Sequence, residues 1–244
     1  MKKQYTFEEL VKIIEELRSE HGCPWDREQT HQSLRPCMME EAAELLAAIR
    51  IYEQTGNAEN MQEELGDIML QAVMHSVIAA EEGIFTLDDV ISGISEKMIR
   101  RHPHVFGTST AEHADQVLEN WEEIKKREKQ GKSWITSPLR EIPAELPSLT
   151  RAVKVAKKLD RLPEFQLCDG QSPIADHDTL MVELQRQVQA FASLGEQASK
   201  EEKEKHMAKL LMNLCHISYR DGLQSEQLLY DEIEKQIDFY EKSV

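Results

Sequence analysis

Residues 40–67 read EEAAELLAAIRIYEQTGNAENMQEELGD, with acidic clusters at both ends and a Gly-Asn break in the middle. Apolar residues spaced three and four apart predict a helix on each side of the break, and the glycine ends the first helix. Because the connection is short, the two helices should form an antiparallel hairpin. We therefore expect the two acidic ends to lie side by side.

Each acidic end presents two carboxylates on one helix face, because residues three apart share a face. Glu41 and Glu44 form one pair, and Glu64 and Asp67 form the other. With the turn near residue 56, Glu44 comes level with Asp67, and Glu41 lies within about one turn of Glu64. Four carboxylates on one seam repel one another unless a cation joins them. All-oxygen ligands suit Mg²⁺ or Mn²⁺, so the pattern predicts a divalent metal site, although either pair alone would more often be a solvated acidic face.

The rest of the chain shows the same helical spacing and no convincing alternation of strand residues, so the fold class is all-α. Further helices are expected at residues 6–21, 86–102, 112–130, 148–160, 178–194, 201–220 and 225–241. Residues 22–33 read as a loop. Residues 131–147 contain three prolines and no helical period, which predicts a linker. It would separate a module at residues 1–130 from a second module at 148–244.

Composition restricts the partners. The 244 residues include 29 Lys and Arg against 45 Asp and Glu, a formal net charge of -16. Such a surface repels the phosphates of DNA and RNA, so no nucleic-acid polymer is expected as a partner. No secretion signal or long apolar stretch is present, which favours a cytoplasmic protein without membrane association. The four cysteines form no CxxC pair and are expected to be reduced thiols.

A basic cluster occurs in EKMIRRHPHVFG, residues 96–107. Lys97 and Arg101 lie on one face of the expected helix, with Arg100 beside them. Cations near a helix C-terminus are favourable in any helix, which is the structural explanation. Beside a carboxylate metal site, the cluster fits a clamp for phosphate oxygens better. We predict that all three cations bind phosphate.

The motifs GCPWDREQTHQSLRPCMMEEAAEL, EELGD, EEGIF and EKMIRRHPHVFG together resemble those of the MazG family of nucleoside triphosphate pyrophosphohydrolases, over about residues 6–130. The resemblance implies an all-α helical bundle that uses Mg²⁺ and forms a homodimer or higher homo-oligomer. It implies that the substrate is a nucleoside triphosphate and that the products are the monophosphate and pyrophosphate. Trp25, in the CPWD motif, would border or stack on the base, or would serve a structural role.

The resemblance also assigns roles to the acidic residues. It implies the metal ligands Glu41, Glu44, Glu64 and Asp67. The reaction would be an in-line attack of a metal-activated water on the α-phosphorus, with pyrophosphate leaving. Either Glu40 or Glu44 would be the general base, and the sequence leaves both open.

Residues 148–244 resemble a degenerate second MazG module. In a by-eye alignment with the first module, one ligand is kept and three are replaced. The aligned residues are Glu183 with Glu41, Arg186 with Glu44, His206 with Glu64 and Lys209 with Asp67. Cations in place of carboxylates would repel Mg²⁺, so we expect this module to be non-catalytic and to be retained for packing or assembly.

Three other functions stay open. The chain could be a narrower dUTPase-like or dCTPase-like hydrolase of the same superfamily, or a non-catalytic regulator that binds nucleotides or a protein. A di-iron carboxylate bundle also uses Glu pairs on facing helices, but it requires ExxH on two of them. The one match, Glu28 and His31, falls in the expected loop. Base preference is not encoded in any local motif.

Overall fold

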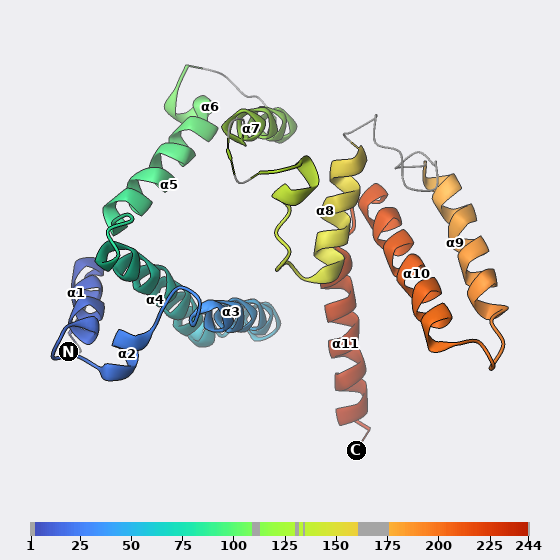
Figure 1. The fold of residues 1–244 in the computed structure, drawn as a ribbon, viewed down its shortest axis with the longest axis horizontal. Coiled ribbons are helices and arrows are strands. Elements are labelled where there is room, and N and C mark those ends of the chain that lie inside the picture. The colour runs from blue at the N-terminus through green and yellow to red at the C-terminus, as the bar shows by residue number, and fades with distance from the viewer. Residues whose placement is uncertain (1–2, 109–112, 130–131, 134, 161–175, 244) are drawn as a thin grey trace. The chain divides into compact units, whose positions relative to one another are not determined.

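The computed structural model describes residues 3–108, 113–129, 132–133, 135–160 and 176–243. The described residues form helices and no strand, which confirms the all-α prediction (Figure 1). None of the described helices combines the length and apolarity needed to cross a bilayer. Contacts divide the chain into two units, Met1–Glu128 and Lys129–Val244. Cys168, and Gly131 and Trp134 of the expected linker, lie outside the described residues.

The first unit is organised around a helical hairpin. Its helices are α1 (Phe7–Arg18), α2 (Pro24–Glu28), α3 (Arg35–Thr55), α4 (Glu59–Glu81), α5 (Leu87–Arg101), α6 (Pro103–Phe106) and α7 (Ala114–Lys129). The hairpin consists of α3 and α4, as predicted. Gly56 ends α3 with φ 73°, and its N–H donates to the carbonyl of Tyr52 at 2.8 Å. Glycine adopts this left-handed conformation without strain, so the chain can reverse within three residues.

The core of the first unit fixes α4 in place. The C-terminal half of α4 packs against α1 and the start of α3 through a cluster of buried side chains. They are Ile14, Leu34, Val73, Met74, Val77 and Ile78. Burying each such side chain contributes about 1.5–3 kcal/mol. This half of α4 is therefore the anchored half, and the other half carries the acidic residues.

Two short helices were missed by the sequence analysis, and α1 is shorter than expected. α2 forms within the expected loop because Pro24 pre-sets the first helical turn, but five residues give no periodic pattern. α6 begins in the same way, with Pro103 in its first turn. α1 ends at Arg18 rather than at about residue 21, because the chain turns back after it. A Cβ on Gly22 would collide with the carbonyl oxygens of Glu16 and Leu17, so that turn requires glycine.

The second unit repeats the order of the main helices of the first. It contains the 3₁₀ helix η1 (Pro138–Glu141) and the helices α8 (Ser148–Asp160), α9 (His177–Ala192), α10 (Lys200–Arg220) and α11 (Ser225–Glu241). α9 and α10 form a hairpin as α3 and α4 do. Gly83 after α4 and Gly222 after α10 have φ 68° and 69°, so both helices end in the same left-handed cap.

Each unit contains an ion pair between equivalent helix ends. The two pairs have their acidic and basic residues exchanged. In the first unit, Arg18 at the end of α1 pairs with Glu81 at the end of α4, at 2.6 Å. In the second unit, Asp160 at the end of α8 pairs with Arg220 at the end of α10, at 3.1 Å. The shared helix order, cap and ion pair are what two diverged copies of one module would keep.

Candidate functional site

Three carboxylates meet across the α3–α4 hairpin. Glu41 comes from α3, and Glu64 and Asp67 come from one face of α4. An oxygen of each lies within 4.8 Å of the other two. We call this group the three-carboxylate site. The short turn at Gly56 and the spacing of three residues on α4 together produce it.

Glu44 and Glu40 lie beside this site rather than in it. Both are exposed and are outside the set of mutually close oxygens. The charge of Glu44 nevertheless raises the pKa values of Glu41 and Glu64. That of Glu40 contributes to the rise at Glu41. These two residues therefore border the site on its solvent side, where a substrate or a water molecule can reach them.

The electrostatics of the site fit a divalent cation. Burial and the charge of Asp67 raise the pKa of Glu41, and burial and the charge of Glu44 raise the pKa of Glu64. Glu64 is only 8% exposed, and its Oε2 has no hydrogen-bond partner among the described residues. A buried carboxylate oxygen without a donor is costly, and a cation removes that cost. An all-oxygen set of this charge suits Mg²⁺ or Mn²⁺.

Two of the predicted phosphate-binding cations are held by a carboxylate that the sequence analysis missed. Glu128 on α7 pairs with Arg100 at 2.8 Å and with Arg101 at 2.5 Å. The hydrogen bonds from Arg101, with help from Arg100, lower the pKa of Glu128 to about 2, although burial opposes the shift. No local pattern marks this residue, because Arg101 and Glu128 are 27 positions apart. Glu128 and several of its neighbours on one face of α7 are half-buried.

The structure records no ion pair between the described cations of the basic cluster and the three-carboxylate site. Lys97 is half-buried on α5. Across the described ranges, no ion pair links Lys97, Arg100 or Arg101 to the three carboxylates. A phosphate chain that contacted both the basic cluster and the three-carboxylate site would have to span the distance between them.

Two tryptophans are candidates for contact with a base. Trp25, at the first turn of α2, is 63% exposed, so it is not a core residue of this chain. Trp121 on α7 was missed by the sequence analysis. It is half-buried, and the guanidinium carbon of Arg101 lies 5.9 Å from its ring centroid. An aromatic ring beside a cation predicted to bind phosphate is a candidate for contact with a nucleotide, but nothing in the local sequence distinguishes this tryptophan from a structural one.

The second unit has no comparable acidic cluster among its described residues. Glu183, the one aligned carboxylate, is hydrogen-bonded by Arg186 at 2.6 Å and by Gln187 at 2.7 Å. The hydrogen bond from Arg186 lowers the pKa of Glu183, and the charge of Lys209 contributes in the same direction. The charge that is uncompensated in the first unit is therefore neutralised in the second.

Comparison with known proteins identifies the relatives of this chain. Residues 29–106 match the family model of the MazG nucleotide pyrophosphohydrolase domain. A Thermotoga maritima protein named nucleoside triphosphate pyrophosphohydrolase/pyrophosphatase MazG is 37% identical over 236 residues, which are 97% of this chain and 84% of that protein. The Escherichia coli K12 nucleoside triphosphate pyrophosphohydrolase is 43% identical over 150 residues, 61% of this chain and 55% of that protein. The uncharacterised YabN of Bacillus subtilis is 49% identical over 153 residues, 63% of this chain and 30% of that protein.

Metal binding should stabilise the fold through the buried carboxylate. We expect Mg²⁺ at about 100 times its Kd to raise the free energy of unfolding by about 2.7 kcal/mol. In Glu64→Gln the repulsion is relieved before metal is added, so the metal-free variant should melt higher and gain little from Mg²⁺. Thermal unfolding with and without EDTA measures both effects. Glu53→Gln, an exposed change elsewhere on the hairpin, is the control, and an equal Mg²⁺ response in Glu64→Gln would contradict the site.

The pairing of Glu128 should appear in the pH dependence of stability. A carboxylate with a lowered pKa stabilises the fold above its unfolded pKa of about 4.5, and this contribution is lost as pH falls through about 2. Glu128→Gln should therefore lower the free energy of unfolding by about 1.5–3 kcal/mol at neutral pH, with the difference shrinking below about pH 4. Urea unfolding across pH measures it. A difference that stays constant down to about pH 2 would show that the arginines do not cause it.

Proposed function

Because the chain belongs to the MazG family of nucleoside triphosphate pyrophosphohydrolases, we propose that it hydrolyses a nucleoside triphosphate to the monophosphate and pyrophosphate at the three-carboxylate site. The observation that carries the proposal is the convergence of Glu41, Glu64 and Asp67, with one buried oxygen that lacks a donor. The names of the Thermotoga and Escherichia coli relatives support the same reaction. A cytoplasmic location, where nucleoside triphosphates are abundant, is part of the proposal.

The carboxylates would hold the cation. Glu41, Glu64 and Asp67 would supply oxygen ligands, and Glu44, whose charge acts on Glu41 and Glu64, would add a fourth. A bound Mg²⁺ or Mn²⁺ would neutralise charge on the phosphates and lower the pKa of a coordinated water. Glu40 and Glu44 are exposed beside the ligands, so either can accept the proton of the attacking water.

The basic cluster would hold the phosphates that the cation leaves uncovered. Arg100 and Arg101 are held by Glu128, so they would lose less conformational freedom on binding than unrestrained arginines. Lys97 forms no ion pair within the described part of the chain and offers a free ammonium. Trp25, exposed at the first turn of α2, would contact the base.

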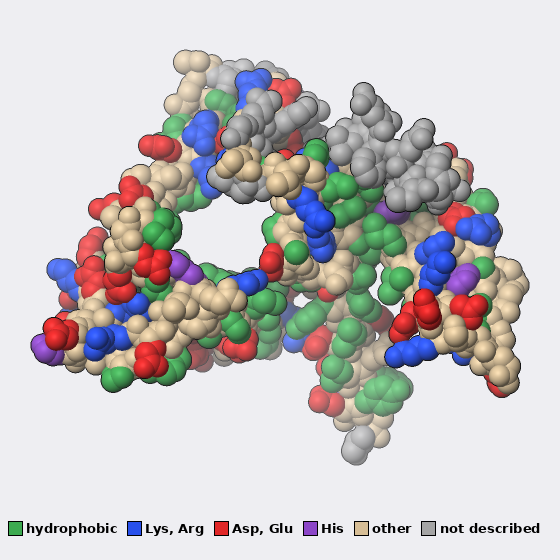
Figure 2. Space-filling view, in the orientation of Figure 1, with side chains coloured by type: hydrophobic (Ala, Val, Ile, Leu, Met, Phe, Trp, Pro, Cys, Tyr) green, Lys and Arg blue, Asp and Glu red, His purple; other side chains and the backbone are tan. Residues whose placement is uncertain are grey.

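A second copy of the chain would cover the apolar surface of the hairpin. Large apolar side chains on α3 and α4 are exposed. They are Met39 at 62%, Leu46 at 64%, Leu65 at 50% and Met69 at 45%. Hydrophobic side chains also reach the surface on the face drawn in Figure 2. Exposed apolar surface of this kind marks protein interfaces, which supports a homodimer or higher homo-oligomer.

Residues 148–244 would act in this assembly and not in catalysis. The proposal extends the predicted modules at residues 1–130 and 148–244, joined by the linker at 131–147. Glu183 is neutralised by Arg186, and the described residues of the second unit hold no cluster like the three-carboxylate site. Packing and assembly are then the roles left for it.

A nucleotide panel with Mg²⁺ tests the reaction and the site together. We expect intact protein to release monophosphate and pyrophosphate, and we expect Glu41→Gln with Asp67→Asn to lose about 100-fold or more in kcat/KM. Glu53→Gln should keep full activity. The ranking of substrates separates a broad enzyme from a dUTPase-like or dCTPase-like one. No turnover of any triphosphate would contradict the proposal and favour a non-catalytic regulator.

Light scattering tests the assembly. We expect the intact chain to have at least twice the mass of one copy, and Leu46→Glu with Leu65→Glu to have the mass of one copy, because two charges would be buried in the interface. Gln54→Glu adds charge to the same hairpin at an exposed polar position and should leave the mass unchanged. A single-copy mass for the unaltered protein would refute the proposed interface.

A further inference from the structure

Two histidines from distant parts of the first unit face each other. His31 lies in the segment between α2 and α3, and His75 lies on α4. Their Nδ1 atoms are 2.8 Å apart, and their ring planes differ by 6°. The ring centroids are 5.1 Å apart. For this separation of the two nitrogens, the centroid distance is close to its largest value, which is reached when both nitrogens lie on the line between the centroids. The rings therefore meet edge to edge, with the two Nδ1 atoms pointing at each other.

This geometry requires one proton between the rings. A neutral imidazole has one N–H donor and one acceptor nitrogen, so one Nδ1 donates and the other accepts. If the two rings shared a metal ion, the lone pairs of both nitrogens would point at the ion. Here the nitrogens point at each other, so the contact does not fit a shared metal ion. A hydrogen bond fits the contact, whereas two protonated rings would bring two donors together and break it.

The surroundings decide which ring accepts. Glu82 Oε2 lies 3.9 Å from Nε2 of His31, on the side of that ring away from His75. We take Nδ1 of His31 as the donor and Nδ1 of His75 as the acceptor, because burial of His75 favours its neutral form. Burial and the neighbouring His31 lower the pKa of His75. Three described charged groups lie around the pair. Glu82 faces His31, and Glu81, the residue before it, forms an ion pair with Arg18.

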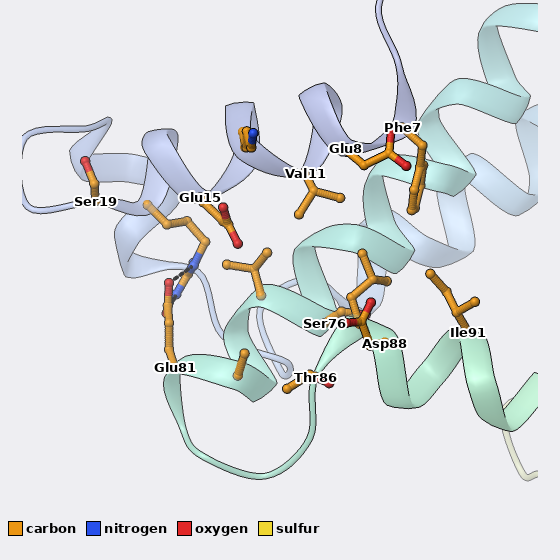
Figure 3. Close-up of a pocket in the computed structure, with 15 residues that line it drawn as sticks. Phe7, Glu8, Val11, Glu15, Ser19, Ser76, Glu81, Thr86, Asp88 and Ile91 are labelled. Carbon is orange, nitrogen blue, oxygen red and sulfur yellow. Dashed lines mark hydrogen bonds and ion pairs between the residues drawn. The ribbon is translucent and has the colours of Figure 1, made fainter.

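The hydrogen bond fastens a segment that Arg18 also holds. Arg18 donates to the carbonyl oxygens of Asp26 and Gln29 at 2.5 and 3.2 Å, and it also pairs with Glu81. Figure 3 shows the interaction with Glu81 at the end of α4. Arg18 thus holds the part of the segment around α2, and the histidines hold the part that leads into α3. Residues 23–34 are tied to the anchored half of α4 at both places.

We propose that the hydrogen bond between His31 and His75 is a clasp that positions residues 23–34, and with them Trp25, for nucleotide binding, and that it opens when both rings carry a proton. His31 and His75 are positioning residues in this scheme. The role in nucleotide binding rests on the proposed function, but the clasp itself does not.

Hydrogen exchange of residues 23–34 in the full chain tests the clasp. Exchange is followed by mass spectrometry at about pH 7.5 and about pH 5.5, on either side of the ordinary histidine pKa, and is corrected for the intrinsic rate. We expect the corrected rate to rise roughly tenfold at the lower pH. An unchanged corrected rate would overturn the proposal.

Matched substitutions separate the clasp from other titrating groups, including His216, whose burial lowers its pKa in the second unit. His75→Asn retains an acceptor oxygen near the position of Nδ1 and takes up no proton, so exchange should be slow at both pH values. His75→Leu has no acceptor and should exchange fast at both. His21→Asn, at an exposed histidine, should behave as the unaltered protein does. A pH response in His75→Asn equal to that of the unaltered protein would refute the clasp.

A second variant and a kinetic measurement complete the test. If His75→Leu fails to fold, His31→Leu removes the same hydrogen bond from the more exposed side and should give the same fast exchange. We expect KM for the nucleotide to rise about threefold or more in these Leu variants, with kcat within about twofold, because positioning acts on binding. If no triphosphate is hydrolysed, exchange still decides the clasp. Normal turnover with unaltered exchange in both Leu variants would remove the clasp and leave the proposed function standing.

Discussion

Packing of the C-terminal half of α4 against α1 makes the acidic hairpin possible. Val73 and Ile78 are almost fully buried there, and this burial holds the helix while its other half carries carboxylates that repel one another. A helix stabilised only by its own hydrogen bonds would fray under such charge. The core therefore supplies the stability that lets the hairpin keep an oxygen of Glu64 buried without a donor among the described residues.

Sequence reasoning could predict that Glu41, Glu64 and Asp67 meet, because the information for that contact is local. The spacing of Glu64 and Asp67 and the short turn at Gly56 place α3 beside α4 without any knowledge of the rest of the fold. The contact of Glu128 with Arg101 and the contact of His31 with His75 could not be found in this way. The two residues of each pair are 27 and 44 positions apart, and no helical period relates them. Such pairs are fixed only by tertiary packing, as is the exposure of Trp25.

The two units differ in whether the carboxylates of their helical hairpins have cationic partners. In the first unit, Glu41 and its neighbours stay uncompensated, which a cation site requires. In the second unit, Glu183 is bound by Arg186 and influenced by Lys209. Internal ion pairs of this kind relieve repulsion and favour the fold directly. The first unit keeps the repulsion that the proposed cation would relieve.

The exchanged ion pair at the helix ends bears on how a chain with two similar halves folds. Tandem copies of one module can misassemble when a helix of one copy docks on the other copy. If α1 met α10 during folding, Arg18 would lie against Arg220, and if α8 met α4, Asp160 would lie against Glu81. Each wrong combination places like charges where each correct one places opposite charges. The reversal of charge thus gives each half a means of recognising its own helices as they emerge during synthesis.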